Sequence, residues 1–441
     1  MITKNYRILI MKSADLLRRA LERIPGGGQT DTKTIDHRLV GIQPSFFVRG
    51  KGVYTQDPDG AWWLDCQMGL AAYVLGYSDA KVNDYVREQL KDGSLFSLAS
   101  TIELEVAEIL LGIFPEFEMV RFAKNGSDVT SAAIRIARRY TGRDYVIGCG
   151  YHGFQDWSMS LRNSITGIPE RIRDLTHGQE EVDPAQALAQ LNAQPQKYAA
   201  VIIDTGGYGV PDLSVLKQLR DKCHQSGTVF IMDEVVSGFR VSLRGTLGYS
   251  SIIPDMICLG KAVANGFPLS VLMGSKSLLS LAPETGMSST FGGDCVALAA
   301  AKATLEQLKD GSVNVAIDAR GAELIKVIDA SIERNGLAER LRVVGYPALF
   351  DLTPFKNDPD KKRIVDYLMC ALAKRHIFWQ ESFVLCRDFG AHEAEVVAAA
   401  LEEAFSDLSL LIQQDRLKEE HQSILRQQEL YLEGLTKESI L

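Results

Sequence analysis

Two charged residues, Asp233 and Lys261, each follow a short apolar run of the sequence. Such runs are typical of buried strands in a parallel sheet, and these strands deliver their last side chains to the edge where ligands bind. An amine and a carboxylate at that edge suit pyridoxal phosphate, whose aldehyde forms a Schiff base with an amine and whose ring nitrogen needs an acid to stay protonated. We therefore predict that Lys261 and Asp233 are catalytic.

Each of these residues has a simpler interpretation when it is taken alone. Asp233 could cap a strand end, and Lys261 could be exposed, as most lysines are. Together, after two apolar strands, they are difficult to explain as surface residues. Because burial disfavours the ammonium form of a lysine, we predict that Lys261 offers a neutral, nucleophilic amine near neutral pH.

A candidate phosphate site lies between a predicted strand and a predicted helix that begins near Asp128. It contains Asn125, Gly126 and Ser127. Backbone N–H groups and a hydroxyl at the positive end of a helix bind anions. The same residue types also form ordinary N-capped turns, so both interpretations stay open for this segment alone. We assign the three residues to cofactor binding.

A Tyr-His-Gly motif, Tyr151 to Gly153, also follows a predicted strand. The Tyr151 ring could stack on a flat cofactor, and glycine would allow a close approach. His152 could act as a general base, but we give this role less weight because the cofactor's own lysine usually moves the proton. Both residues are assigned to the cofactor site.

Thr290 lies in a Ser-Thr-Phe-Gly-Gly segment before a helix predicted to begin near Cys295. This segment could be a simple N-capped turn, yet the Thr290 hydroxyl is also suited to donate a hydrogen bond to a phosphate. We therefore add Thr290 to the predicted cofactor contacts.

These residues need a sheet to bring them together, and the sequence alternates between strand and helix patterns from about residue 100. The predicted helices are 101–113 and 128–140, and the predicted strands are 119–123, 144–149, 199–204, 228–233, 256–260 and 270–274. This alternation indicates a mostly parallel sheet that is covered by helices on both faces.

The flanking regions have a different pattern. We predict a helix over 11–24 that ends at three glycines, and a small antiparallel unit over 45–75 with a turn at Asp57 to Gly60. After about residue 310 the sequence is rich in helix patterns, with strands near 348–352 and 383–387. Residues 408–441 are predicted to form one long helix, which packs either on a partner or on its own subunit.

The predicted domain organisation has four parts. Residues 1–75 form an N-terminal segment that belongs to a small domain, and residues 76–309 form the large cofactor-binding domain. Residues 310–407 form the C-terminal part of the small domain, and residues 408–441 form a helical extension.

The composition excludes several classes of protein. The 441 residues are 46% hydrophobic and 24% charged, as in an ordinary globular protein of more than one domain. The net charge of −8 is spread without a basic block, which argues against a nucleic-acid partner. The seven cysteines show no CxxC spacing, so we predict neither a zinc site nor a disulfide framework. Without a signal-peptide pattern or a long apolar run, we expect a cytoplasmic protein with no membrane span.

The order of five motifs resembles the class III aminotransferases, in particular the branch that contains glutamate-1-semialdehyde aminomutase. The motifs are Asn-Gly-Ser-Asp at 125–128, Tyr-His-Gly at 151–153, Asp-Glu-Val at 233–235, Gly-Lys at 260–261 and Ser-Thr-Phe-Gly-Gly at 289–293. The resemblance extends over most of residues 11–405. Several motifs in the same order are far more specific than any one of them.

The resemblance implies an α/β fold, the fold-type I transferase, with a mostly parallel seven-stranded sheet in a large domain and a smaller α+β domain. It implies pyridoxal 5'-phosphate as cofactor, with Lys261 forming the internal aldimine and Asp233 pairing with the pyridine nitrogen. Val235 would support one face of the ring and Tyr151 would stack on the other.

The resemblance also implies a homodimer with active sites shared between the subunits. Gly126 and Ser127 would hold the cofactor phosphate. Thr290 would reach that phosphate from the neighbouring subunit. The reaction would be a ping-pong transfer of an amino group, with a small-molecule amino donor and a carbonyl acceptor.

Two departures from the family pattern concern the substrate pocket. Gln67, Met68 and Gly69 stand where the aminomutases have Ser-Trp-Gly, and the segment 382–387 lacks the glutamate of their late Phe-Glu-Ala-Gly-Phe motif. A third departure is Asp204-Thr205 in place of the usual Glu-Pro.

These departures favour an intermolecular aminotransferase whose substrate pocket includes Gln67, Met68 and Arg387. The donor would be glutamate or another amino acid, and the acceptor a sugar or cyclic keto compound of a biosynthetic pathway. Arg387 could bind a carboxylate or form an ordinary salt bridge. The alternatives are an intramolecular aminomutase and a noncatalytic cofactor-binding scaffold, which the retained Lys261 and Asp233 disfavour.

Overall fold

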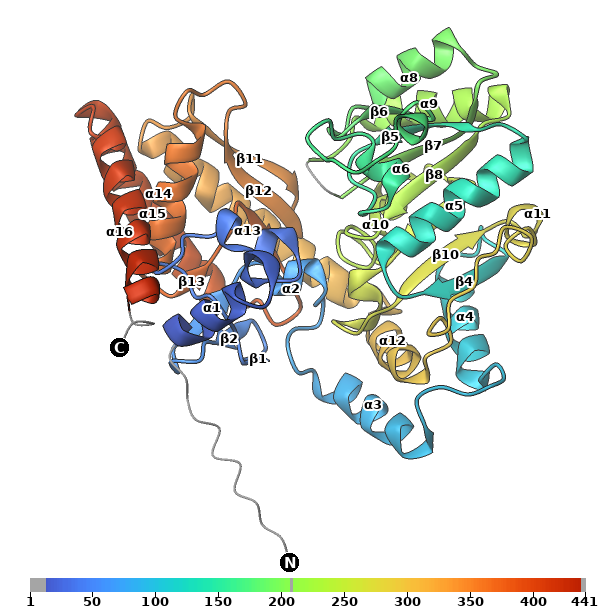
Figure 1. Cartoon of the computed structure of the whole chain (residues 1–441), viewed down its shortest axis with the longest axis horizontal. Coiled ribbons are helices and arrows are strands. Elements are labelled where there is room, and N and C mark those ends of the chain that lie inside the picture. Colours follow the sequence, from blue (N-terminus) through green and yellow to red (C-terminus); the bar gives the residue numbers. More distant parts are fainter. Residues whose placement is uncertain (1–12, 207–208, 438–441) are drawn as a thin grey trace, which may run out of the picture.

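A seven-stranded sheet forms the centre of the larger lobe in the computed structural model, which describes residues 13–206 and 209–437 (Figure 1). The strand order is β4-β10-β9-β8-β7-β5-β6, and β10 runs antiparallel to both of its neighbours. The other adjacent pairs are parallel. The strands are β4 (Met119–Ala123), β5 (Tyr145–Cys149), β6 (Thr176–Gln179), β7 (Tyr198–Asp204), β8 (Val229–Glu234), β9 (Met256–Leu259) and β10 (Ser270–Gly274). The predicted α/β fold with a mostly parallel sheet is confirmed.

Burial of the strands on both faces explains why their sequences are continuous apolar runs. In β8, Ile231 belongs to the hydrophobic cluster on the side of α5 (Gly126–Thr141). Its neighbours Phe230 and Met232 belong to the cluster on the other side, together with α12 (Cys295–Leu308). Since successive side chains of a strand point to opposite faces, a strand covered by helices on both faces must be apolar throughout.

The remaining helices connect and cover these strands. They are α3 (Ala80–Asp92), α4 (Thr101–Ile113), α6 (Asp156–Met159), α7 (Glu170–Arg173), α8 (Pro184–Ala193), α9 (Leu213–Ser226), α10 (Gly245–Ser250), α11 (Lys276–Leu279) and the short turn η4 (Lys261–Ala264). The helix α5 begins at Gly126, two residues before the predicted start near Asp128. Asp128 lies within the first turn, and its carboxylate accepts a hydrogen bond from the Asn125 N–H just before the helix.

The smaller lobe combines segments from both ends of the chain. A four-stranded sheet has the order β1-β2-β3-β13, and a three-stranded sheet the order β11-β12-β14. The strands are β1 (Arg49–Lys51), β2 (Tyr54–Gln56), β3 (Trp62–Asp65), β11 (Leu341–Tyr346), β12 (Leu349–Pro354), β13 (Ile377–Phe378) and β14 (Ser382–Val384). The antiparallel pair β2 and β3 has the predicted turn at Asp57 to Gly60. β13 pairs in parallel with β3, so distant parts of the sequence share one sheet.

Short helical turns and longer helices complete this lobe. They are α1 (Ser13–Leu21), α2 (Met68–Ala71), α13 (Ser312–Arg334), α14 (Lys361–Ala373), α15 (Ala391–Gln413) and α16 (Leu417–Lys437), with the turns η1 (Pro25–Gly27), η2 (Asp31–Lys33) and η3 (Ile35–His37). Within the described ranges, no helix is both long and apolar enough to cross a bilayer.

The prediction of one uninterrupted helix over 408–441 is wrong. The helix α15 ends at Gln413, and α16 begins at Leu417 after a turn in which Asp415 adopts a φ of 54°. α16 then packs on α14 of the same chain, where His421 Nε2 lies 2.8 Å from Asp366 Oδ2. Figure 1 shows α14, α15 and α16 side by side at the edge of the smaller lobe.

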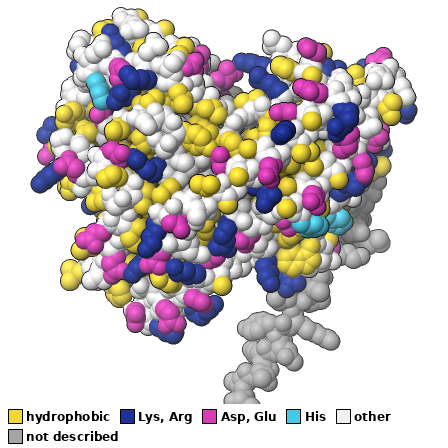
Figure 2. Space-filling model, turned by 180° about the vertical axis from the view of Figure 1, so that it is seen from behind, with side chains coloured by type: hydrophobic (Ala, Val, Ile, Leu, Met, Phe, Trp, Pro, Cys, Tyr) yellow, Lys and Arg dark blue, Asp and Glu magenta, His cyan; other side chains and the backbone are white. Residues whose placement is uncertain are grey.

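Charges of both signs are mixed over the face of the molecule that Figure 2 shows. In Figure 2, the Lys and Arg side chains of the visible face lie among Asp and Glu side chains and do not gather into one basic area. The described side chains of this face form no basic stripe of the kind by which proteins neutralise nucleic-acid phosphates.

Candidate active site

A buried carboxylate, Asp233, lies near the end of β8 and is held from two sides. Its Oδ2 atom lies 2.9 Å from His152 Nδ1, and its Oδ1 atom accepts a hydrogen bond from the Val235 N–H at 3.1 Å. Asp233 is only 4% exposed. The structure therefore joins two motifs that lie far apart in the sequence, at the edge of the sheet where the sequence predicted a site.

The His152 ring is fixed by its own surroundings. It stacks on Trp157 with the ring centroids 5.8 Å apart and the planes 12° from parallel. The Thr130 hydroxyl donates to the His152 carbonyl at 2.7 Å. The Nε2 atom is buried and has no partner among the described residues. Because an ionised carboxylate can only accept, the proton shared with Asp233 sits on Nδ1, and His152 orients the acid.

Lys261 lies directly after β9, the strand next to β8, and begins the turn η4 with a φ of 42°. Its side chain is partly buried. Burial lowers the pKa of the Lys261 amine, while the charges of Asp204 and Asp233 oppose this effect. A lowered pKa makes the neutral amine more available as a nucleophile, which is the property predicted for this residue.

Val235 connects the lysine strand with the candidate phosphate segment. A Cβ atom on Gly126 would lie 2.9 Å from Val235 Cγ1, and one on Gly260 would lie 3.2 Å from the same atom. Only glycine fits at the tighter position without displacing the valine. These contacts bring Gly126, Gly260 and the segment after Asp233 together around the Val235 side chain.

The start of α5 has free N–H groups beside the Tyr-His-Gly loop. The Asn125 N–H donates to Asp128 Oδ2 at 2.8 Å, and Ser270 Oγ donates to the Asn125 carbonyl at 2.8 Å. Gly153 adopts a φ of 105°, and a Cβ there would lie 2.6 Å from the Ser127 side chain. The first N–H groups of a 16-residue helix form an anion-binding end. The segment is an N-capped turn, and it also fits a phosphate.

Tyr151 extends away from the protein core. Its ring is 44% exposed and carries the Arg162 guanidinium at 5.2 Å from the ring centroid. An accessible ring on the residue before His152, which binds Asp233, suits stacking on a planar cofactor. Thr290 is exposed in the loop between α11 and α12, and its neighbour Gly292 packs near the Phe122 carbonyl of β4, the edge strand. This chain alone does not bring Thr290 to the other residues.

The predicted substrate residues Gln67 and Met68 lie in an unusual turn. Met68, Gly69, Leu70 and Ala71 all have a φ between 45° and 65°, so α2 is a single turn of left-handed helix. Met68 is completely buried, and Gln67 Nε2 donates to the Ser382 carbonyl at 2.8 Å. Left-handed turns of L-residues cost about 1–2 kcal/mol per residue, and such strain is found mainly at functional sites.

Arg387 forms ordinary ion pairs in this structure, which is one of the two roles considered for it. Its guanidinium lies 3.0 Å from Asp79 Oδ2 and 2.9 Å from Asp388 Oδ1, and it also donates to Gln307 Oε1 at 3.1 Å. These bonds link the segment after β14 to the start of α3. A substrate carboxylate would have to compete with the Asp79 and Asp388 carboxylates for the Arg387 guanidinium.

Two functional positions escaped the sequence analysis. Arg240 is completely buried and donates to the carbonyls of Leu385, Ala71 and Tyr73. Burial lowers its pKa to about 10. A buried arginine cannot be recognised from its neighbours in the sequence, although its position seven residues after Asp233 was a signal that it lies near the site.

Asn265 is the second such position. Its Oδ1 accepts from the N–H groups of Val74 and Leu75 at 3.0 and 2.9 Å, and its Nδ2 donates to the Gly76 carbonyl at 3.1 Å. Asn265 comes four residues after Lys261, so it connects the lysine turn to the loop that follows α2. Its place four residues after Lys261 was the available signal.

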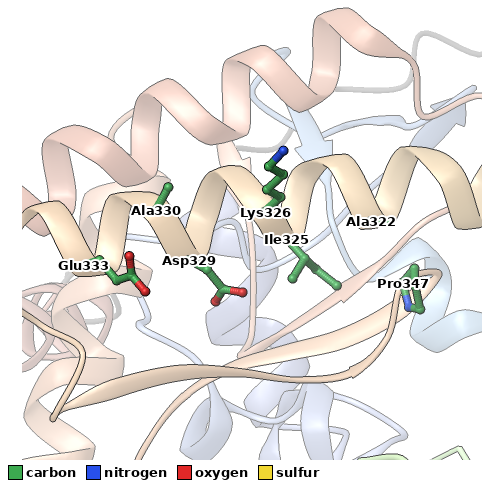
Figure 3. Close-up of a pocket in the computed structure, with 7 residues that line it drawn as sticks. All are labelled: Ala322, Ile325, Lys326, Asp329, Ala330, Glu333 and Pro347. Atoms are coloured by element: carbon green, nitrogen blue, oxygen red, sulfur yellow. The ribbon is translucent and has the colours of Figure 1, made fainter.

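A shallow groove elsewhere on the protein does not contain these residues. It is lined by α13 and Pro347, and Figure 3 shows the Asp329 and Glu333 carboxylates directed away from the Lys326 ammonium. Burial and the neighbouring Glu333 raise the pKa of Asp329. No group of residues that could hold a metal ion occurs in the part of the chain that the structure describes.

Comparisons with known proteins identify the family. The sequence model of the family described as Aminotransferase class-III matches residues 37–372. The chain is 31% identical over 421 residues to glutamate-1-semialdehyde 2,1-aminomutase of Dechloromonas aromatica, covering 88% of this chain and 97% of that protein.

Two solved structures are similar in fold. The pyridoxal phosphate internal aldimine form of the Sphingopyxis sp. MTA144 FumI protein has a TM-score of 0.82 and 25% identity, over 91% of this chain and 97% of that one. An omega-transaminase from Sphaerobacter thermophilus has a TM-score of 0.80 and 25% identity, over 91% and 99%.

Proposed function

Because the chain belongs to the class III aminotransferase family, we propose that it moves amino groups with pyridoxal phosphate, its cofactor, at the edge of the seven-stranded sheet. The observation that carries this proposal is the group around Asp233. A buried carboxylate held by His152 lies on the strand next to Lys261, whose amine pKa is lowered by burial. Few structural roles need this combination.

The residues of the chain have distinct roles in this proposal. When bound, the cofactor supplies an aldehyde and an electron-withdrawing ring. Lys261 would be the nucleophile that holds the cofactor aldehyde, and its amine would serve as the base that moves a proton at the substrate carbon. Asp233 keeps a proton on the ring nitrogen. His152 holds Asp233 in the orientation that this requires.

The other end of the cofactor would meet the start of α5. We assign Asn125, Gly126 and Ser127 to the phosphate, since they lie at the start of a 16-residue helix, where the helix dipole favours an anion. Tyr151 would cover one face of the ring and Val235 the other. Supporting this arrangement, Gly126 packs against Val235 and Ser127 packs against Gly153 of the Tyr151 loop.

We also propose that the protein is a homodimer in which each Thr290 reaches the phosphate of the other active site. Thr290 is exposed next to Phe291, which is 59% exposed. The nearby α3–α4 connection carries Phe96 and Leu98, which are 48% and 85% exposed, and the Cys295 N–H donates to the Ser94 carbonyl at 2.9 Å. Adjacent exposed apolar side chains mark an interaction surface.

The names of the curated relatives favour an intramolecular reaction. Several are glutamate-1-semialdehyde 2,1-aminomutases, and the alignments extend over nearly the full length of the first of them. The names of these relatives therefore support an aminomutase more strongly than the intermolecular aminotransferase that was the main expectation from the sequence.

The substrate side of the site supports the second candidate, an intermolecular aminotransferase. Gln67 and Met68 replace the Ser-Trp pair, and Met68 is completely buried in a left-handed turn. The Gln67 amide is bound to Ser382 of the segment that lacks the expected glutamate. A pocket built in this way would accept a carbonyl compound other than glutamate-1-semialdehyde.

An absorption spectrum separates these possibilities. The purified protein is mixed with pyridoxal phosphate, and the visible band is followed after addition of L-glutamate and other amino donors. A band that disappears with a donor and returns with a carbonyl acceptor supports an intermolecular aminotransferase. Isomerisation of glutamate-1-semialdehyde without donor or acceptor supports the aminomutase. If no visible band forms, the protein does not bind the cofactor through Lys261, and a noncatalytic scaffold becomes the better interpretation.

A further inference from the structure

A second buried carboxylate, Asp204, lies next to Asp233 at the edge of the sheet. Asp204 ends β7, and in the parallel pairing of β7 with β8 it is the direct partner of Asp233. Residues at the same register of neighbouring strands project to the same face of a sheet. The two carboxylates therefore point to the same side, where Asp233 is assigned to the cofactor.

The surroundings of Asp204 are as closely packed as those of Asp233. Asp204 is 5% exposed, and its Oδ1 atom accepts from the Gly206 N–H at 2.9 Å. Gly150, which precedes Tyr151, has a φ of 104°, and a Cβ on it would lie 2.5 Å from the Asp204 Cβ. Asp204 is thus enclosed between β8 and the Tyr151 loop.

The charges around Asp204 make it responsive to pH. Burial and the charge of Asp233 raise the pKa of Asp204 to about 6, while His152 and Lys261 act in the opposite direction. At neutral pH the site therefore holds two carboxylates, faced by one lysine and one histidine. Nearby positive charge reduces the repulsion between two buried like charges.

This inference rests on the proposed function. We propose that Asp204 is a positioning residue that acts through Asp233: its negative charge helps to keep the cofactor's ring nitrogen protonated, and also the Lys261 nitrogen once that nitrogen is bonded to the cofactor. Asp204 is followed by Thr205, whose N–H donates to the Asp233 carbonyl at 3.2 Å, so the end of β7 is tied to the segment that carries Asp233. An anion beside a cationic site raises the pKa of the cation, by about 1–3 units at 4–6 Å separation.

The test is a pH titration of the visible band of the protein loaded with pyridoxal phosphate. The wild type is compared with Asp204→Asn, which keeps the oxygen that accepts from Gly206 but removes the charge. We expect the spectral midpoint to move to lower pH by about one unit, because the neighbouring cations lose their anion. Asp204→Glu keeps the charge and should restore a midpoint near that of the wild type.

The outcomes are distinct. A merely structural role for Asp204 would lower thermal stability in the Asn variant and leave the midpoint within about 0.2 units of the wild type, which would overturn the inference. If the Asn variant does not fold, Asp204→Ser removes the same charge and is titrated in its place. If the wild type itself forms no visible band, the proposed function fails before the inference is tested, and the two failures cannot be confused.

Discussion

Lys261 carries an electrostatic cost in the protein without cofactor. Burial lowers the pKa of its amine, so the unfolded chain binds more protons than the folded chain at pH values between the lowered pKa and the ordinary value of 10.5. The cost is fully present below the folded pKa and disappears above 10.5. We therefore expect Lys261→Met to raise the free energy of unfolding at pH 7.5, and the gain to shrink as the pH approaches 10.5.

Urea unfolding of the cofactor-free protein at pH 7.5 and pH 10 measures this difference. Lys276→Met, at an exposed lysine, is the control and should change stability little at either pH. The same Lys261→Met protein should form no visible band with pyridoxal phosphate and lose about 10²–10⁴-fold in turnover. Turnover at the wild-type rate would contradict the assigned role.

Glu234, next to Asp233, gives the opposite pH dependence. It is completely buried, and burial raises its pKa to about 7, although Ser237 and the Thr246 N–H donate to it. Between the ordinary value near 4.5 and about 7 the folded chain binds more protons than the unfolded chain, so stability falls as pH rises through this window. The full loss is about 3 kcal/mol at most.

The variant Glu234→Gln tests this expectation, because an amide does not ionise. Its free energy of unfolding should vary less between pH 5 and pH 8 than that of the wild type. Glu323→Gln, on the exposed side of α13, serves as the control. Equal slopes for the wild type and Glu234→Gln would show that Glu234 titrates normally.

The catalytic pair could be predicted at the residue scale because strand ends are visible in the sequence. Asp233 and Lys261 follow apolar runs, and parallel strands bring their ends to one edge. The partners of these residues could not be predicted in the same way. Asp204 also ends a predicted apolar strand, but the sequence does not show which strand it pairs with, and nothing near Arg240 indicates that this arginine is buried, because its burial depends on packing by distant segments.

At the element scale, the left-handed turn α2 and the loop after it depend on groups from the two catalytic segments. Arg240 binds the Ala71 and Tyr73 carbonyls, and Asn265 binds the Val74 and Leu75 N–H groups. Asn265→Ala leaves two buried N–H groups without partners, each costing about 1–3 kcal/mol. We expect a loss of about 2–5 kcal/mol in the free energy of unfolding, measured with urea.

The exposed Asn163 supplies a control for this substitution. Asn163→Ala should change the free energy of unfolding by less than about 0.5 kcal/mol. If Asn265→Ala were equally mild, water would have to replace the lost acceptor, and the loop after α2 would not depend on the lysine turn.

The elements with strong patterns were predicted well, and those with weak patterns were not. β7 and β8 are apolar until the acidic residues at their ends, whereas β6 has the sequence Thr-His-Gly-Gln and was missed. The break between α15 and α16 was also missed, because neither glycine nor proline marks it. Asp415 makes the turn with a positive φ, which aspartate tolerates better than most residues.

At the scale of the whole molecule, the pairing of β13 with β3 joins segments that are more than three hundred residues apart. Local sequence patterns carry no information about such contacts, so only the general expectation of a small domain built from both ends of the chain was available. The domain boundaries stay predictions. The assembly of two chains into a dimer also stays a prediction, because it depends on surface side chains and not on the order of helices and strands.

The proposed dimer depends on the exposed apolar side chains beside Thr290. Leu98 is 85% exposed in the single chain, and a charge placed there would be buried without a partner if a second copy covers it. We expect Leu98→Glu to shift the protein from dimer to monomer in sedimentation velocity. Because each Thr290 would then be lost from the other site, the variant should also release pyridoxal phosphate more readily.

The matched control is Leu430→Glu on α16, where the leucine is 52% exposed and far from Thr290 in the sequence. It should leave both the sedimentation coefficient and the cofactor affinity unchanged. Thr290→Ala separates the two effects of Leu98→Glu, since it should weaken cofactor binding by about tenfold, as expected for one hydrogen bond to a charged group, while the dimer persists. A dimeric Leu98→Glu protein would place the contact surface elsewhere, and a monomer that retains the cofactor as firmly as the wild type would remove Thr290 from the phosphate site.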